Sequence, residues 1–467
     1  MPGPDDFLGV SVAEQEVKHE ALSDCSGIPQ GDRRSIRDDA LLVEPISALQ
    51  PRSLLMLQGP ASPFWAELGE GLRSAGWQVH KVHLCLPDQL FWRGDGVAYR
   101  GQFKDWEAWL TRLIESEKPS DILYYADRLP YHVVAARVAE RFGIRAWCFE
   151  NGYLRPDWVT MEPVGMSRFS RFPKSPARLQ QLAASGAAPD PSVRYPHCFW
   201  KEAVREVSYG FMIPISRLSY PGYTPDRYYD PILDYASWGL RVARRVMGSV
   251  SRNSLLRDLN VHSFEYTLLA MQLQSDYQIR ASSDYGHLSG MLDDVIGSFA
   301  QTAPKSRHLV VKGHPMDNGW ENWPRHIARL SRDYGVADRV HWLDGGSLPE
   351  LLARAKGLIT VNSTVGLHAI RQDCPVITLG SAVYDISGLT HQSGIDRFWN
   401  NPDPVDSGLV TSVLAALAGW IQVRGSFHDP AGRAACVKEV VHRFESPEKY
   451  WLLSGENLSL WSAEANV

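Results

Sequence analysis

Cysteine is scarce in this sequence, and no two cysteines stand at the spacing of a metal-binding or redox pair. Among 467 residues there are six cysteines and no Cys-x-x-Cys motif. This scatter argues against a structural zinc site and against a disulfide framework. We therefore expect a protein of the reducing cytoplasm. The six positions are Cys25, Cys85, Cys148, Cys198, Cys374 and Cys436.

Long hydrophobic runs are also missing. No window approaches about 18 consecutive apolar residues, and residues 1–20 lack the basic-then-apolar plan of a secretory signal. We expect a soluble protein that contacts a membrane only peripherally, should its acceptor be a lipid. Residues 238–252 (WGLRVARRVMGSVSR) mix four arginines with apolar residues at helical spacing. This pattern suits a membrane surface, but it is more often an ordinary amphipathic surface helix.

The sequence has no excess of positive charge. Its formal net charge is −5, so it lacks the basic footprint of a nucleic-acid-binding protein, and we expect no nucleic-acid partner. With 44% hydrophobic and 22% charged residues, the chain has the composition of a globular protein of about two to three domains. Its 16 Trp and 18 Tyr suit core packing and also sugar stacking.

Common nucleotide and metal motifs are absent as well. The loop after the first predicted strand contains Gly59, whose small size would allow a ligand to approach the backbone. This loop has neither the Gly-x-Gly-x-x-Gly fingerprint nor a Walker lysine, so dinucleotide and ATP binding are not supported. No Asp-x-Asp-type pair stands where a metal would bridge a diphosphate. We expect no metal ion and no cofactor.

Short apolar runs alternate with helical patterns through most of the chain, which predicts parallel sheets covered by helices. In the first half the predicted strands are 53–57, 77–84, 121–125 and 145–149, and the predicted helices are 64–76, 106–117 and 131–142. In the second half the predicted strands are 266–273, 308–312, 340–343, 357–361 and 375–379, and the predicted helices are 288–302, 322–334, 348–355 and 365–371.

This rhythm predicts an α/β fold of the GT-B-like class, with two Rossmann-like, doubly wound domains facing a cleft. The Pro-rich and aromatic region 160–260 is expected to form helices and loops between them. A helix over 431–451 is expected to pack back on the first domain. The predicted organisation is a mobile tail over 1–48, a first domain over 49–258, a second domain over 259–425, and a closing helix and tail over 426–467.

Polar residues follow three predicted strands of the second half, at the sheet edge where doubly wound folds bind nucleotides. After the second strand, Lys312 or His314 could meet a phosphate, and Pro315 would fix the turn. After the first strand, Gln274 and Asp276 could read a base or ribose, although they could also decorate a loop. The three segments together outline one nucleotide site.

The third of these segments opens a predicted helix with Asn362, Ser363 and Thr364. Free N–H groups and the helix dipole favour an anion at such a position. Serine and threonine are also favoured there as ordinary helix caps, so both interpretations stay open.

Charged residues follow two strands of the first half. Asp127 and Arg128 come after one strand, as a functional pair or a structural salt bridge. Glu150 comes directly after another, in the segment FENGYLRPDW. Glycosyl transfer needs a carboxylate beside the anomeric carbon, because its transition state resembles an oxocarbenium ion, and Glu150 is the first candidate. Arg155 could pair with a carboxylate on the donor sugar. A tight turn with solvated charges is the alternative.

Seven segments between residues 52 and 400 resemble, in the same order, the KpsS/LipB-type capsular polysaccharide proteins. Their succession over most of the chain is more specific than any one of them. The segments are QGPASPFW, DQLFWRGDGVAYRG, YYADRLPYH, FENGYLRPDWVTME, QLQSDYQI, KGHP and VNSTVGLHAI.

The resemblance implies a retaining-type β-Kdo transferase that moves the first Kdo from CMP-Kdo to a lysophosphatidylglycerol anchor. It implies a site of action at the inner membrane face, beside a KpsC-type transferase that extends the linker and beside the capsule export machinery. It also carries CMP binding over to His314 and Ser363.

One departure from related enzymes bears on the nucleophile. Relatives of the KpsC type show Glu-Asp-Gly-Phe where this chain has Glu150, Asn151, Gly152 and Tyr153, so the second acid is absent. Glu150 or Asp127 must then act if the chemistry is a double displacement. Two other functions stay open, a transferase for a different nucleotide sugar and a non-catalytic component of the capsule assembly or export complex.

Overall fold

The structure is a computed structural model, and it describes residues 52–452 apart from 185–189, 191, 196–198, 227, 230–236, 238–254 and 260–263. All described residues belong to one compact unit, Pro51–Val467. The tail predicted over 1–48 and the basic segment 238–252 lie outside the described residues, as do Cys25 and Cys198.

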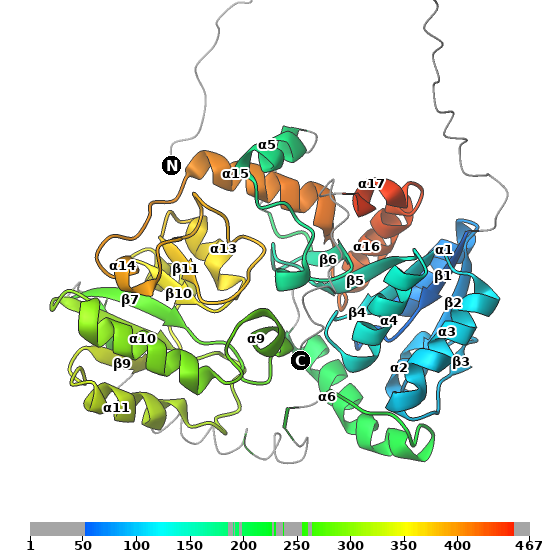
Figure 1. The fold of residues 1–467 in the computed structure, drawn as a ribbon, viewed down its shortest axis with the longest axis horizontal. Helices are drawn as coiled ribbons and strands as arrows, with labels where there is room; N and C mark the ends of the chain where they lie inside the picture. The colour runs from blue at the N-terminus through cyan, green and yellow to red at the C-terminus, as the bar shows by residue number, and fades with distance from the viewer. Residues whose placement is uncertain are drawn as a thin grey trace, which may run out of the picture. The chain divides into compact units, whose positions relative to one another are not determined.

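A seven-stranded sheet, in the order β12-β6-β5-β4-β1-β2-β3, forms the centre of the first half (Figure 1). Strands β1 to β5 run parallel, whereas β6 and β12 extend one edge in antiparallel pairing. The strands are β1 (Ser53–Met56), β2 (Gln78–His83), β3 (Val97–Ala98), β4 (Asp121–Tyr125), β5 (Arg145–Asn151), β6 (Trp158–Pro163) and β12 (Gln422–Arg424).

Helices cover both faces of this sheet because successive side chains of each buried strand point to opposite sides. Leu55 of β1 belongs to the core under α3 and α4, whereas Leu54 and Met56 belong to the core under α1 and α16. The helices of this half are α1 (Phe64–Ser74), α2 (Leu86–Trp92), α3 (Trp106–Glu117), α4 (Pro130–Arg141), α5 (Pro176–Ala184), α6 (Phe199–Ile215), α16 (Pro430–Arg443) and α17 (Pro447–Trp451), with short helical turns η1 (Phe103–Asp105), η2 (Ser167–Phe169), η3 (Ser216–Leu218) and η4 (Leu417–Ile421).

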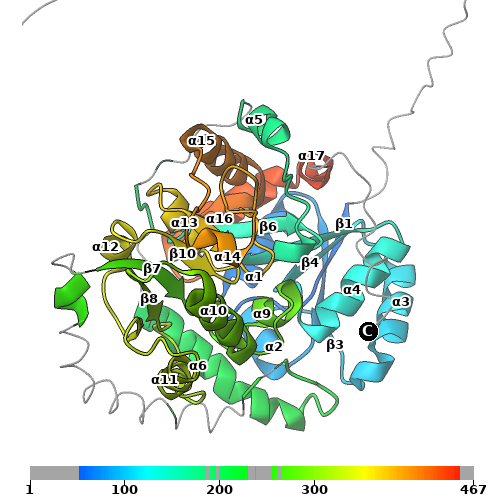
Figure 2. The same cartoon turned by 60° about the vertical axis from the view of Figure 1, so that its left-hand side comes forward.

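A five-stranded parallel sheet, in the order β11-β10-β7-β8-β9, forms the second half (Figure 2). Leu269 packs in the core under α10 and α11, and Leu268 packs on the opposite face near α12 and α13. The elements are β7 (Glu265–Ala270), α9 (Tyr277–Ser282), α10 (Leu288–Thr302), β8 (Arg307–Lys312), α11 (Trp323–Asp333), β9 (Val340–Leu343), α12 (Leu348–Leu352), β10 (Leu358–Thr360), α13 (Val365–Ile370), β11 (Val376–Thr378), α14 (Ile395–Phe398) and α15 (Ser407–Ala416).

The predicted fold class is confirmed, because both sheets have doubly wound order. In each sheet the first strand lies between the second and the fourth, so that β1 is flanked by β2 and β4, and β7 by β8 and β10. The chain reverses direction across the sheet between the first and fourth strands, and ligands of such folds bind outside the carboxyl ends of the strands there. The fold therefore offers two switch points, β1/β4 and β7/β10.

Three details differ from the sequence prediction. The first sheet is mixed rather than parallel, because the chain turns back after β5 and forms β6. Strand β12, within the range 259–425 assigned to the second domain, pairs with β6 of the first sheet. The helix predicted over 431–451 is two helices, since Pro447 cannot continue α16 and instead begins α17. As predicted, α16 packs on the first half, where Arg433 Nε lies 2.9 Å from Glu67 Oε2.

The described helices include none that combines the length and the apolar character needed to cross a bilayer.

Candidate functional site

The polar segments of the second half follow three neighbouring strands, with the switch point between β7 and β10. There the buried Gln272 side chain donates from Nε2 to Asn362 Oδ1 at 2.8 Å and accepts from the Asn362 N–H at 3.0 Å. Asn362 Nδ2 donates to the Gln278 carbonyl at 3.1 Å. These side-chain hydrogen bonds hold the loops after β7 and β10 together, at the sheet edge that is predicted to bind a nucleotide.

Gln274 and Asp276 both bond to nearby backbone groups. Gln274 Oε1 accepts from the Leu288 N–H at 2.8 Å, which supports the start of α10. Asp276 caps α9 by accepting from the Gln278 N–H at 2.9 Å. Burial raises the pKa of Asp276, while that hydrogen bond and the charge of Arg155 oppose the shift. Gln274 therefore shapes the loop, whereas Asp276 lies within electrostatic reach of the first half.

Lys312 and His314 lie at the end of β8. Lys312 is buried as the last residue of the strand, and its carbonyl accepts from the Met271 N–H at 3.0 Å. His314 Nδ1 accepts from the Met316 N–H at 3.1 Å, which fixes the ring in the turn, with Pro315 exposed beside it. The predicted position after a buried strand is confirmed, and the predicted phosphate contact stays a prediction.

Ser363 and Thr364 immediately precede α13, as expected. Ser363 Oγ accepts from the Val365 N–H at 3.3 Å, and the Ser363 carbonyl accepts from the Tyr384 hydroxyl. Thr364 occupies the cap position without a side-chain cap bond. The helix start is thus confirmed, with serine in a local capping bond.

In the first half, Gly59 follows β1 at the β1/β4 switch point. A Cβ atom here would lie 2.5 Å from Trp65 Cγ, so packing against Trp65 is sufficient reason for the glycine. The Gly59 N–H donates to Asp88 Oδ1 at 3.4 Å, and Asp88 in turn pairs with the buried Lys81 at 2.8 Å. The atoms that would lie closest to a Cβ at Gly59 in this structure belong to the side chain of Trp65.

Glu150 lies inside β5 rather than directly after it, because pairing with β6 extends the strand to Asn151. Its Oε1 accepts from the Tyr125 hydroxyl at 2.8 Å and from the Asn151 N–H at 2.9 Å. Its Oε2 accepts from the Tyr277 hydroxyl at 3.2 Å. Burial raises the pKa of Glu150, and the bonds from Asn151 and Tyr125 oppose the rise. A carboxyl shifted towards neutral pH suits proton exchange.

Tyr277 links the two halves at this carboxylate. It begins α9, which follows β7, and its hydroxyl interacts with Asp127 as well as with Glu150. Sequence reasoning did not single out Tyr277. The contact spans 127 positions of the chain, and no local pattern encodes it.

Asp127 and Arg128 form the charged pair expected after β4. Asp127 is fully buried; its Oδ2 accepts from the Met166 N–H at 3.0 Å and lies 3.4 Å from Arg128 Nε. Within the described part of the chain, Asp127 Oδ1 is buried with no hydrogen-bond partner. Burial raises the pKa of Asp127, and the adjacent Arg128 opposes the rise.

A third carboxyl, Glu162 on β6, was not predicted. It is fully buried and accepts from the Tyr153 hydroxyl at 2.7 Å and from the Ser170 hydroxyl. Burial raises the pKa of Glu162 to about 8 against the effect of these two bonds, and the nearby Asp127 adds to the rise. The only sequence signal for it is one acid within the otherwise strand-like run WVTME.

Arg155 projects from the loop between β5 and β6 and is exposed, as a donor-binding cation would have to be. Its Nε donates to the Gly152 carbonyl at 3.4 Å. Its charge acts on Glu150 in the first half and on Asp276 in the second. Arg155 therefore lies among the candidate groups of both halves.

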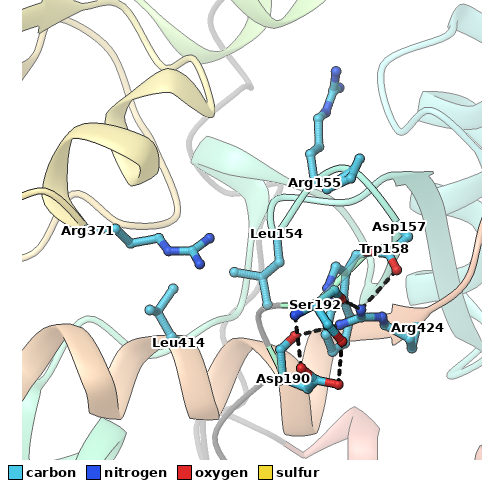
Figure 3. Close-up of a pocket in the computed structure, with 10 residues that line it drawn as sticks. Leu154, Arg155, Asp157, Trp158, Asp190, Ser192, Arg371, Leu414 and Arg424 are labelled. Carbon is cyan, nitrogen blue, oxygen red and sulfur yellow. Dashed lines mark hydrogen bonds and ion pairs between the residues drawn. The ribbon is translucent and has the colours of Figure 1, made fainter. Parts of the chain in front are cut away.

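A small pocket beneath Arg155 also receives residues from both halves (Figure 3). One wall is the ion pair between Asp157 and Arg424, at 2.9 Å, and Arg371 approaches Leu154 from the opposite side. The guanidinium of Arg155 points away from that ion pair. Three arginines therefore line one pocket, and only Arg424 is paired with a carboxylate in its wall.

The described residues include no group of three His, Cys, Asp or Glu side chains placed to hold a metal ion. The first sheet instead gathers three carboxyls of raised pKa, and tyrosine hydroxyls donate to two of them. Such groups can accept and release protons, and Arg155 can pair with an anion.

A family model described as capsule polysaccharide biosynthesis protein matches residues 120–428. The chain is also 32% identical over 388 residues to the capsule polysaccharide export protein KpsS of Escherichia coli, covering 81% of this chain and 98% of that protein. The chain belongs to the capsule polysaccharide biosynthesis family. The capsule polysaccharide modification protein LipB of Neisseria meningitidis serogroup B is 28% identical over 386 residues, 80% of this chain and 91% of LipB.

Among solved structures, the β-Kdo 2,7 transferase of Thermosulfurimonas dismutans KpsC matches 85% of this capsule-family chain and 99% of its own, with 12% identity and a TM-score of 0.42. The β-Kdo 2,4 transferase of the same KpsC matches 84% and 98%, with 14% identity and a TM-score of 0.39.

The capsule-family match begins at β4 and ends after β12, so it includes all three carboxyls of the first sheet and the whole second sheet. Gly59 lies before it.

Proposed function

We propose that this chain is a glycosyltransferase of capsular polysaccharide synthesis that moves Kdo from CMP-Kdo to a lysophosphatidylglycerol anchor. The observation that carries the proposal is Glu150, a carboxylate of raised pKa at the carboxyl end of β5 that accepts a hydrogen bond from Tyr277 of the other half. A transferase must bring donor and acceptor together, and a carboxylate of one half that is hydrogen-bonded by a residue of the other half suits that purpose.

The nucleotide is assigned to the second half. The loops after β7, β8 and β10 would hold CMP, with His314 and Ser363 at its phosphate. The choice of CMP-Kdo rests on the resemblance to KpsS/LipB-type proteins. Arg155 would pair with the carboxylate of Kdo, because a guanidinium binds a carboxylate through two parallel hydrogen bonds.

The chemistry proposed is a retaining double displacement. A carboxylate oxygen of Glu150 or Asp127 attacks the anomeric carbon, and the bond to the CMP phosphate oxygen breaks with its electron pair leaving on CMP. The acceptor hydroxyl then attacks the same carbon, loses its proton to a carboxylate and releases the first carboxylate. Exclusion of water by the contact between the halves would protect the activated sugar.

The acceptor is assigned to the first half. A pocket of about 190 Å³ at the β1/β4 switch point is lined by Gln58, Tyr131 and Tyr209, among others. Gln58 Nε2 donates to the Tyr209 hydroxyl at 2.7 Å, so polar groups line the pocket beside aromatic and apolar side chains such as Tyr223 and Ile213. Such a pocket suits a glycerol headgroup attached to an acyl chain. The enzyme would act at the inner membrane face, with a KpsC-type transferase and the export machinery as partners.

The proposal is tested by incubating the purified chain with CMP-Kdo and a fluorescent lysophosphatidylglycerol and measuring the mass of the lipid. A gain of one Kdo is expected. An unchanged lipid, together with absent CMP binding, would contradict the proposal. A gain with another nucleotide sugar only would keep the transferase and replace the donor.

The second candidate is a non-catalytic component of the capsule assembly or export complex, favoured by the word export in the name of the Escherichia coli relative. Exchange of Glu150 distinguishes the two functions in cells. Glu150→Gln should leave capsule formation intact for an assembly component and abolish it for a transferase.

A further inference from the structure

Helix α6 exposes an apolar stripe along its outer face. Val204, Val207, Phe211, Ile215 and Leu218 recur every three or four residues from α6 into η3, which places them on one side of the helix. Leu218 is 88% exposed, Phe211 54% and Ile215 53%. Side chains of this kind normally face the core, so a continuous exposed row indicates a contact surface.

Helix α2 packs beside the last turns of α6 and adds one exposed apolar residue to this surface. The Leu86 N–H donates to Ser216 Oγ at 3.1 Å, and Phe91 stacks on Tyr209, so the two helices are packed together. Leu90, between those contacts, is exposed. We call Leu90 and the five residues of the α6 row the apolar stripe.

Arginines lie beside the apolar stripe, two of them at its η3 end. Arg217 is exposed beside Leu218, and Arg93 is exposed at the end of α2. The guanidinium of Arg100, also exposed, lies 6.0 Å from the ring of Tyr220, next to η3. One carboxylate, Asp95, lies in the same loop as Arg93. Three exposed arginines and one carboxylate therefore lie beside the stripe, although the whole chain carries −5.

The inner face of the same helix lines the proposed acceptor pocket. Tyr209 and Ile213 of α6 belong to the wall of the 190 Å³ pocket beside Gln58. A lipid entering from a surface that contacts the apolar stripe would have to pass only one helix to reach that pocket. The stripe and the proposed acceptor pocket thus lie on opposite faces of one helix.

A second copy of the chain fits this stripe less well. Stable interfaces between proteins use about 20–30 residues a side, and six side chains in a narrow row are far fewer. An apolar row with a basic end instead matches helices that lie in the headgroup region of anionic membranes.

We propose that the apolar stripe, with Arg93, Arg100 and Arg217, docks the protein on an anionic phospholipid bilayer. The docking face orients the acceptor pocket towards the membrane, and in this respect it rests on the proposed lipid acceptor. The apolar side chains enter the headgroup boundary, and the arginines pair with lipid phosphates.

The test is sedimentation of the full chain with vesicles of equal parts phosphatidylglycerol and phosphatidylcholine, without any sugar donor. The double variant Phe211→Asp with Leu218→Asp should lower the vesicle partition coefficient by about tenfold or more, because two apolar anchors are lost. Arg217→Gln should weaken binding to these vesicles only, and leave binding to pure phosphatidylcholine unchanged. Leu452→Asp, at a residue 62% exposed at the end of α17, is the matched control and should bind as wild type does.

Wild-type protein that stays unbound, or a double variant that sediments as well as wild type, would overturn the docking face. A double variant that turns a wild-type dimer into a monomer with unchanged vesicle binding would assign the stripe to a second copy and overturn it too. The proposed function fails separately, since a chain that binds vesicles and transfers no Kdo keeps the docking face and loses the transferase. Equal thermal midpoints of the variants confirm that folding is intact.

Discussion

The three buried carboxyls differ in how well their surroundings stabilise the negative charge. They are Glu150, Asp127 and Glu162. Glu150 accepts three hydrogen bonds, and Asp127 has a neighbouring arginine, whereas Glu162 has two hydroxyl donors and no cation within salt-bridge distance in the described chain. Burial therefore raises the pKa of Glu162 to about 8. At neutral pH this carboxyl is mainly protonated, so it can act as a proton donor.

The first prediction concerns the stability of the Glu162→Gln variant. The pKa of Glu162 is raised on folding, so the folded state binds more protons than the unfolded state between about pH 4.5 and 8. Stability contributed by protonated Glu162 is complete below that window and is lost as pH rises through it. Wild type should lose about 4 kcal/mol relative to Glu162→Gln across the window, measured by urea unfolding.

Tyr153→Phe is the control for this pH dependence, because it removes one donor to Glu162 and keeps the carboxyl. It should keep the pH-dependent loss. Parallel stability curves for wild type and Glu162→Gln would show that Glu162 titrates at its ordinary pKa.

The second prediction concerns His314. If its ring contacts the donor phosphate, His314→Ala should lower CMP affinity about tenfold, the loss expected for a hydrogen bond to a charged group. Isothermal calorimetry measures this directly. His442→Ala, on the exposed end of α16, should leave the affinity unchanged. An unaltered affinity in His314→Ala would remove His314 from the site.

At the scale of elements, the β5–β6 hairpin positions Glu150 and Glu162 together. Its turn brings the backbones close, and a Cβ atom at Gly152 would lie 2.4 Å from the Trp158 carbonyl oxygen. Backbone atoms cannot move aside as a flexible side chain can, so the hairpin requires glycine here. The carboxylates are therefore held by the backbone of β5 and β6.

The third prediction follows from this contact. Gly152→Ala should destabilise the fold by roughly 1–3 kcal/mol and lower transfer activity, because the hairpin must shift. Gly286→Ala is the control, since no atom lies within 4 Å of a Cβ built at that exposed position. Thermal unfolding of both variants gives the comparison, and equal midpoints would contradict the steric argument.

The sequence predicted the helices and strands whose apolar residues repeat with one clear period. Helices 106–117 and 288–302 and strands 121–125 and 340–343 have the predicted bounds. Helix α6 was not found because its apolar residues face both inwards and outwards, with Pro214 near its end, so no single stripe marks it. The strands β6 and β12 form an antiparallel edge, which the rhythm of alternating strands and helices does not encode.

The candidate site could be predicted by position but not by contact. Topology places the residues after parallel strands at the carboxyl edge of their sheet. For that reason His314 and Asn362 lie at this edge of the second sheet, and Asp127 lies at this edge of the first. Side-chain partners depend on long-range packing, so Gln274 is held by backbone groups and Tyr277 meets Glu150 without any local signal. The roles of all these residues in binding and catalysis stay predictions.

For the whole chain, the central feature is contact between the halves beside the carboxylates. Tyr277 joins α9 to Glu150, Arg168 Nη2 lies 2.8 Å from Asp284 Oδ1, and Lys174 donates to the carbonyls of the loop after β11. These contacts connect the proposed donor half to the proposed acceptor half. A substitution of Glu150 therefore tests both the proposed chemistry and the contact between the halves.

The most direct measurement is Kdo transfer from CMP-Kdo to lysophosphatidylglycerol by wild type and by Glu150→Gln, followed by mass analysis of the lipid. We expect transfer by wild type and a loss of about a hundredfold or more in the variant, with CMP affinity and thermal midpoint unchanged. Glu70→Gln, at an exposed glutamate of α1, should transfer as wild type does. Full transfer by Glu150→Gln would contradict the central claim that this carboxylate performs the chemistry.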